Sequence, residues 1–209
     1  IKGLVFRNTN TTGNTVSLIK ISGDNNKVYG CYLGVDPNGT SSTNTAQYGV
    51  QVISGTSNSI GDGTAAGANL ISGNSNAGIT VSAFVSIKGN MIGLDKYGTT
   101  AIPNKRYGIY GGSPTLTGLV IGGSAAGEGN VISGNGDGSG IYGVGICAFG
   151  VTKGNRMGTT ANGLAVPTAN VQLVGVAYDA MPGFILGGTG AGDGNLISGN
   201  ILYGIFGSC

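Results

Sequence analysis

The sequence contains no histidine and no tryptophan, and only 9% of its 209 residues are charged. The absence of histidine excludes His-dependent triads, His-ligated zinc and the histidine-containing sites of many β-helix polysaccharide hydrolases. The ten basic and eight acidic residues give a net charge of +2 and are scattered along the chain. Scattered charge gives no indication of nucleic acid binding or of an anionic membrane surface. No run reaches the roughly 20 apolar residues that cross a bilayer, so we expect no membrane insertion.

Glycine is abundant, at 44 residues, but it does not follow the triplet period of collagen. The pattern Asn-(Leu/Val)-Ile-Ser-Gly-Asn occurs at 69–74, 130–135 and 195–200. A second pattern, Ile-Gly or Leu-Gly, begins at Ile60, Ile121 and Leu186, so both patterns recur with offsets of 61 and 65 residues. Two patterns in one register predict stacked copies of a single structural unit.

Three short apolar segments lie within each unit, separated by Gly, Asn, Ser and Thr clusters that predict turns. We therefore predict an all-β fold, a right-handed parallel β-helix (a solenoid) of about nine or ten coils in three superrepeats. With about 4.8 Å per coil, the rod would be about 45 Å long. The chain 1–209 would be one domain, with superrepeats at approximately 21–80, 81–141 and 142–209 after an N-terminal coil.

Equivalent positions in the three units predict columns of stacked side chains. We expect Ile71, Ile132 and Ile197 to form one internal column, and Ile79, Ile141 and Ile205 another. Asparagine amides at equivalent corners can bond along the stack. The predicted structural ladder consists of Asn69, Asn74, Asn130, Asn135, Asn195 and Asn200.

These repeats resemble a family of bacterial parallel β-helix proteins whose units read Asn-x-Ile-Gly-Gly, Gly-x-Gly-Asn-x-Ile-Ser-Gly-Asn and Gly-Asn-x-Ile-Gly-x-Asp. The segments Leu186–Asn200 and Gly89–Asp95 match this pattern closely. Three positions depart from it. Cys31 occupies the position that Asn90 and Asn155 occupy in the later copies, and Thr160 occupies that of Asp36 and Asp95. The turn before Asn69 is one residue shorter than the turns before Asn130 and Asn195. The resemblance implies a module of a secreted or cell-surface protein, and it implies no activity.

Few residues are candidates for catalysis. A lyase or epimerase could use Lys105, Arg106 and Tyr107, although these residues also suit a solvated corner with snorkelling side chains. Asp36 and Asp95 occupy equivalent positions, but we expect three coils, about 14 Å, between them, which is too far for a glycosidase pair. Glu128 and Asp193 also occupy equivalent turns, where solvation is the expected role. We predict no metal site and no cofactor.

Two binding functions are also compatible with the sequence. Exposed tyrosines suit carbohydrate stacking, and those available are Tyr32, Tyr48, Tyr97, Tyr107, Tyr110, Tyr142, Tyr178 and Tyr203. An ice-binding face would need a flat threonine array, for which Thr40, Thr99-Thr100 and Thr159-Thr160 are the candidates.

The three cysteines, Cys31, Cys147 and Cys209, are far apart in the predicted rod. We expect at least three coils between any two of them, more than 14 Å, whereas a disulfide needs Cα atoms within about 7 Å. The sequence therefore predicts buried thiols, or an intermolecular bond at Cys209.

The chain starts at Ile1 without methionine and its repeat breaks off near Cys209, which suggests a processed form or a segment of a longer protein. Neither end reads as a polar cap, so we expect self-association or neighbouring domains to cover the end coils. We predict an extracellular or cell-surface structural or adhesive protein, with a filament subunit as one form. The alternative is a polysaccharide-acting lyase or epimerase, whose groove would carry charged and aromatic residues from adjacent coils.

Overall fold

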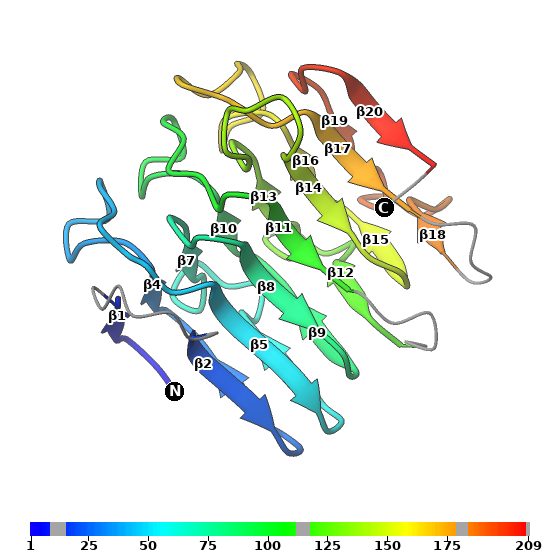
Figure 1. Ribbon diagram of the computed structural model, residues 1–209. Coiled ribbons are helices and arrows are strands. Elements are labelled where there is room, and N and C mark those ends of the chain that lie inside the picture. Colours follow the sequence, from blue (N-terminus) through cyan, green and yellow to red (C-terminus); the bar gives the residue numbers. More distant parts are fainter. Residues whose placement is uncertain (9–15, 112–117, 179–183, 208–209) are drawn as a thin grey trace.

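The computed structural model describes residues 1–8, 16–111, 118–178 and 184–207, and within these ranges it contains strands and no helix (Figure 1). Its strands form three parallel sheets. Consecutive strands along the chain fall in successive sheets, so the chain winds as a parallel β-solenoid with one strand of each sheet per coil. The predicted all-β, parallel β-helix class is confirmed.

The strands of each sheet lie at nearly constant register from coil to coil. The first sheet contains β1 (Val5–Phe6), β4 (Tyr32–Leu33), β7 (Leu70–Ile71), β10 (Met91–Ile92), β13 (Val131–Ile132), β16 (Arg156–Met157) and β19 (Leu196–Ile197). The second sheet contains β2 (Ser17–Ser22), β5 (Tyr48–Ser54), β8 (Ala77–Val81), β11 (Tyr107–Tyr110), β14 (Val144–Cys147), β17 (Val174–Ala177) and β20 (Tyr203–Phe206). The third sheet contains β3 (Lys27–Val28), β6 (Asn58–Ile60), β9 (Val85–Ile87), β12 (Val120–Gly122), β15 (Val151–Lys153) and β18 (Ile185–Leu186).

The predicted number of coils is wrong. The described strands form six coils and a partial seventh made of β19 and β20, so the stack is about 29 Å long at about 4.8 Å per coil. The error has a simple cause, because each apolar segment is one side of a coil and not a whole coil. Met91-Ile92 and Val120-Ile121 belong to the same coil, and Val131-Ile132 begins the next one. Each superrepeat therefore contains two coils.

The core consists of one column of apolar side chains per sheet. Ile71, Ile132 and Ile197 share a column, as predicted, with Ile92 and Met157 between them. In the second sheet, Ile79 and Ile205 belong to a column completed by Ile109, Ile146 and Val176.

Ile141 does not belong to that column, which corrects the prediction. Its side chain is 74% exposed, whereas Ile146 is fully buried at the expected position. Eleven residues separate Ile132 from Val144, but only five separate Ile71 from Ala77. The longer loop shifts the strand along the sequence, and an offset counted from the Asn-x-Ile-Ser-Gly-Asn pattern misses this shift.

Two asparagine ladders run along the stack, one from Asn69 to Asn195 and one from Asn44 to Asn200. In the first, Asn69, Asn90, Asn130 and Asn155 each donate from Nδ2 to the Oδ1 of the next member, at 2.8–3.1 Å, and Asn195 is the last acceptor. In the second, Asn44, Asn74, Asn104, Asn135, Gln172 and Asn200 are linked in the same way at 2.8–3.2 Å. The six asparagines chosen from the sequence are alternate members of these ladders, and the residues between them are the ladder members of the intervening coils. Most members are buried, so their mutual bonds satisfy groups that water does not reach.

Replacement of one inner ladder member should strongly destabilise the fold. Asn130→Ala would remove the acceptor of the Asn90 backbone amide and the donor to the Ile87 carbonyl, and it would leave Asn155 Oδ1 with only the backbone amide of residue 130 as donor. Each buried group left without a partner costs about 1–3 kcal/mol, so we expect the free energy of unfolding to fall by about 3 kcal/mol or more in urea titrations. Asn76→Ala, in a half-buried turn, is the control and should change it by under about 1 kcal/mol. Equal effects of the two variants would contradict a special role for the ladder.

Candidate functional site

The three candidate catalytic residues diverge in the structure, although they are consecutive in sequence. Lys105 is exposed and lines a shallow hollow with Thr40, Ser42 and Pro103, in the loops that connect the first sheet to the second. Arg106 and Tyr107 line a different hollow, of about 250 Å³, on the outer face of the second sheet. The structure therefore does not bring the three side chains to one point.

The hollow on the second sheet is the floor of a groove that spans several coils. Its floor consists of Val144, Val174 and Ala177, which pack in an apolar cluster separate from the central core. Tyr107 on β11 bounds it on one side and Phe206 on β20 on the other. We call this feature the sheet groove. It is built on regular strands, so its floor is fixed by the backbone pairing of β11, β14, β17 and β20.

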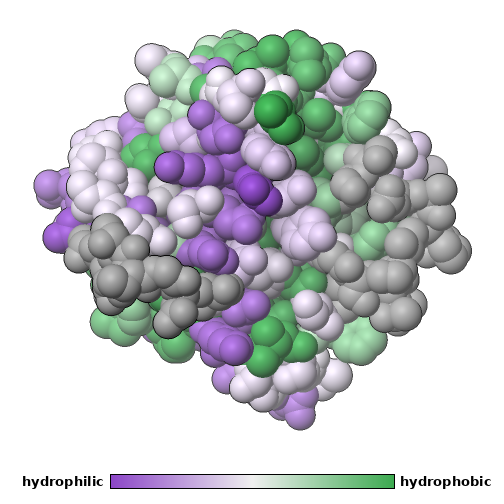
Figure 2. Space-filling model, viewed as in Figure 1, coloured by the Kyte–Doolittle hydropathy of each residue, from purple (hydrophilic) through white to green (hydrophobic). Residues whose placement is uncertain are grey.

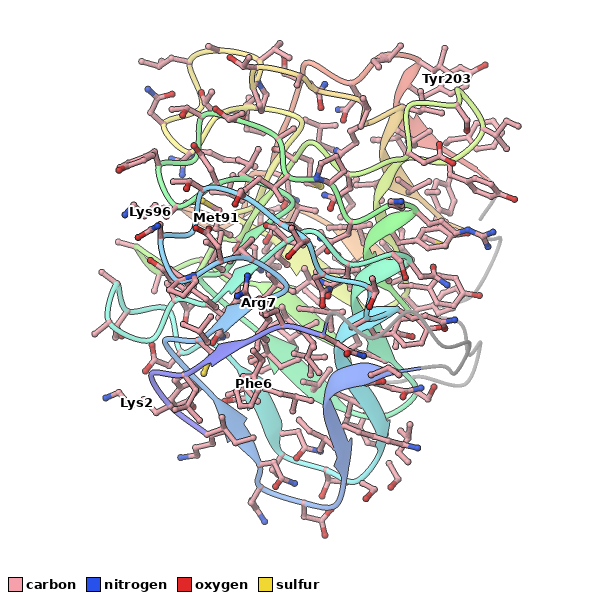
Figure 3. All side chains as sticks on the ribbon, turned by 60° about the vertical axis from the view of Figure 1, so that its left-hand side comes forward. Lys2, Phe6, Arg7, Met91, Lys96 and Tyr203 are labelled. Atoms are coloured by element: carbon pink, nitrogen blue, oxygen red, sulfur yellow. The ribbon has the colours of Figure 1, made fainter. Side chains whose placement is uncertain are left out.

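An aromatic pair stands on each side of the sheet groove. The rings of Tyr107 and Tyr110 lie 4.8 Å apart, and those of Tyr203 and Phe206 are stacked at 5.1 Å. Tyr203 lies on the outer side of the last strand, at the end of the solenoid (Figure 3). The strands that bear the two pairs are three strand spacings apart, about 14 Å. The strands between them carry smaller side chains, so the sheet groove lies between two aromatic walls.

Arg106 is the only charged residue among the described residues that line the sheet groove. Its guanidinium lies over the ring of Tyr142, 4.2 Å from the centroid, a geometry typical of a cation–π contact. Burial raises the pKa of Tyr107, and the neighbouring Tyr110 adds to this shift. A raised pKa keeps the phenol protonated, so Tyr107 suits hydrogen bonding better than proton abstraction.

A second hollow of about 330 Å³ lies outside the first sheet. It is lined by Tyr32, Leu70, Met91 and Lys96, together with alanines of the 65–68 turn. Met91 and Lys96 lie close together on this side of the solenoid (Figure 3), and the Lys96 ammonium lies 5.1 Å from the ring centroid of Tyr97. This hollow has a single aromatic wall, so we consider the sheet groove the stronger candidate site.

Asp36 and Asp95 are only two coils apart, which corrects the predicted three, because they follow β4 and β10. Each carboxylate accepts bonds from the backbone of its own loop: Asp36 from Thr40 and Ser41, and Asp95 from Thr99 and Thr100. The backbone amides of Ser41 and Thr40 lower the pKa of Asp36. Both aspartates thus stabilise loops.

The threonine candidates for an ice-binding face do not form an exposed array. Thr159 and Thr160 are buried, at 3% and 7% exposure. The backbone amides of Thr99 and Thr100 bond to Asp95 in a turn.

Glu128 and Asp193 form ion pairs, where solvation of a turn was expected. Lys88 Nζ lies 2.7 Å from Glu128, and Lys153 Nζ lies 3.0 Å from Asp193. The sequence carried a signal for this pairing, because both copies with a carboxylate have lysine in a Lys-Gly-Asn pattern. The first copy has neither a carboxylate nor this lysine, and Tyr29 stands in its place.

Asp193 also links distant coils through Ser124, whose hydroxyl donates to its carboxylate. The bond from Ser124 is the largest cause of a lowered pKa of Asp193, to about 2, followed by the bond from Lys153 and the amide of Gly190. A carboxylate with a lowered pKa in the folded state stabilises the fold above its ordinary pKa. That stability is lost as the pH falls from about 3.8 to about 2.

Asp193→Asn should therefore lower the melting temperature at neutral pH, and the difference from the parent protein should shrink as the pH approaches about 2. Thermal unfolding followed by circular dichroism across this range measures the effect. Glu128→Gln, at the equivalent pair, should show the same direction because Lys88 lowers the pKa of Glu128. A difference for Asp193→Asn that does not change with pH would contradict the assignment.

The cysteines also correct the sequence prediction. Cys147 on β14 is disulfide-bonded, whereas Cys31 is a buried free thiol. Cys209 lies outside the described residues. The prediction assumed about three coils between Cys147 and the end of the chain, whereas only two strand spacings separate β14 from the last described strand, β20.

Thiol titration tests this assignment directly. The chain has three cysteines, so with one disulfide the denatured, unreduced protein should expose one thiol per chain, and the reduced protein three. The native protein should react slowly because Cys31 is fully buried. Three reactive thiols before reduction would show that the disulfide does not form.

Comparisons with family models, curated proteins and solved structures found no match to this chain. Within residues 1–8, 16–111, 118–178 and 184–207, no group of three or more His, Cys, Asp or Glu side chains could hold a metal ion. The same described part of the chain contains no helix long and apolar enough to cross a membrane. The class of protein is thus defined by the fold, a parallel β-solenoid.

Proposed function

We propose that this chain is an extracellular structural or adhesive β-solenoid whose end coils are covered by a second copy, stacked head to tail. One observation carries the proposal. Ile205 of the last coil is 50% exposed, whereas Ile109, Ile146 and Val176 in the same column are completely buried. An inward-facing position that is exposed only at the end of the stack calls for one more coil.

Apolar residues are exposed at both ends of the solenoid. At one end, Leu4 and Val5 are 50% and 45% exposed. At the other end, hydrophobic residues gather around β19 and β20, at the top of Figure 2, and they include Ile201 and Leu202. β1 and β19 lie at opposite edges of the first sheet, and β2 and β20 at opposite edges of the second (Figure 1). Each edge strand presents backbone groups that a strand of another chain can pair with.

The order of strands at the two ends also suits head-to-tail stacking. The third sheet has six strands and the other two have seven, so the last coil lacks a third side among the described residues. Ile1-Lys2-Gly3 repeats the sequence of Ile87-Lys88-Gly89 at the end of β9. Lys2 pairs with Tyr29, just after β3. If a second copy stacks on this end, its Ile1 and Lys2 would lie above β18 of the first copy. Its β1 and β2 would then lie above β19 and β20 of the first copy.

Two further features support an extracellular location. Disulfides persist in oxidising compartments and are rare in the cytosol, so the bond at Cys147 favours secretion. The resemblance to secreted bacterial repeat proteins rests on the Asn-x-Ile-Ser-Gly-Asn pattern, and the membership of this chain in that family is part of the proposal.

A lyase or epimerase has less support, because Tyr107 has a raised pKa and Arg106 contacts Tyr142.

The assembly can be tested with charged residues placed at each end. We expect Ile205→Lys or Leu4→Lys to abolish fibres that the parent protein forms at high concentration in electron micrographs, because each variant buries a charge at one junction. Leu164→Lys is the matched control, since Leu164 is 87% exposed in a loop at the side, and it should assemble like the parent.

A mixture of the two end variants tests the direction of stacking. Each variant keeps one intact end, so a head-to-tail contact allows one junction and the mixture should sediment as a dimer in analytical ultracentrifugation. Head-to-head contacts would instead let each variant dimerise alone through its intact end. Monomers of the parent protein at every concentration would overturn the proposal and favour coverage by further coils of a longer chain.

A further inference from the structure

We propose that the sheet groove binds a short segment of an acidic, uronic-acid-containing polysaccharide. The proposal combines the two aromatic walls, the apolar floor and the single guanidinium at Arg106. It does not depend on end-to-end assembly. The groove lies on the outer face of the second sheet, whereas stacking covers the end coils of the solenoid.

The walls and the floor suit the faces of sugar rings. Pyranose rings present C–H groups on their faces and hydroxyls around their edges, so an aromatic ring contacts the face while the hydroxyls stay hydrated. Tyrosine also offers a phenol that bonds such hydroxyls. The side chains of Tyr203 and Phe206 are 50% and 43% exposed, and are thus accessible for contacts of this kind.

Arg106 determines the charge of the ligand. A guanidinium binds a carboxylate through two parallel hydrogen bonds, and the contact of Arg106 with the ring of Tyr142 holds its guanidinium beside the groove. No carboxylate is present among the described lining residues. A uronate would therefore meet a cation in a lining without carboxylates, while Asp137, whose pKa is lowered by bonds from Ser139 and also by Arg106, lies outside this lining.

The floor of the groove is closely packed, and a preformed floor reduces the entropy lost on binding. A glycine precedes the inward-facing residue in each of these strands, as in Gly108-Ile109 and Gly145-Ile146. A Cβ atom on Gly108 would lie 2.5 Å from Ile132 Cγ2 and 2.6 Å from the carbonyl oxygen of Gly145. Such close packing fixes Tyr107, the residue directly before Gly108, against the neighbouring coil.

The position of the groove argues against a peptide as its occupant. A peptide that joins a sheet needs an edge strand with unpaired backbone groups. The floor strands β14 and β17 lie inside the second sheet and are paired on both sides, and the unpaired edge of β20 faces away from them, toward the end of the solenoid. Recognition in the groove therefore depends on side chains, a mode that suits rings and carboxylates.

Isothermal titration calorimetry can test the proposal with a trisaccharide of galacturonic acid and a neutral trisaccharide of galactose. The parent protein should bind the acidic trisaccharide more tightly. Arg106→Gln should weaken binding of the acidic trisaccharide about tenfold and leave the neutral one unchanged. Phe206→Ala should weaken binding of both sugars by about fivefold.

Tyr97→Ala is the matched control, because Tyr97 is a 65% exposed tyrosine outside the groove, and it should bind like the parent. All variants alter exposed or partly exposed side chains, and equal melting temperatures would establish that they are folded. Absence of binding of the acidic trisaccharide to the parent protein, or equal losses in Arg106→Gln and Tyr97→Ala, would overturn the proposal.

Discussion

The fold depends on one constraint, the match between each coil and the coil before it. Parallel backbone pairing places equivalent residues of successive coils directly above one another, so any polar group inside the stack faces its own counterpart. The two asparagine ladders satisfy this constraint because an amide can donate to one neighbour and accept from the other. A single replacement inside a ladder therefore affects two coils. The alternation of donor and acceptor explains why the pattern Asn-x-Ile-Ser-Gly-Asn recurs with so little change.

The same constraint leaves the outside of the solenoid free to vary. Outward residues of the second sheet change from Tyr107 through Val144 and Val174 to Tyr203, although the inward column stays aliphatic throughout. This difference in side-chain size between coils produces the sheet groove without any change in the backbone. A solenoid can thus acquire a binding surface by outward substitutions alone, at little cost to its core.

The ends of the solenoid follow from its one-dimensional order. Each coil is buried by its two neighbours, so a terminal coil has only half of its contacts. The exposure of Ile205 is a direct consequence, since every other member of its column from Val50 to Val176 is fully buried. The ion pair between Lys153 and Asp193, together with the bond from Ser124, holds the last coils in place on the third side. Assembly would use the backbone edges of the end coils, and ligand binding would use the outer face of the second sheet.

The sequence by itself determined the fold class, the alternating ladder members and the register of Ile71, Ile132 and Ile197, because repeated residues report what is repeated in space. It did not determine the number of coils, since an apolar segment has the same appearance whether it forms one side of a coil or a whole coil. Only the tertiary structure revealed the position of Ile141 and the ion pairs of Glu128 and Asp193. Differences in loop length change which residues of successive coils lie side by side. The sheet groove was also hidden, since Tyr107 and Phe206 are about 100 residues apart and meet only where separate coils stack.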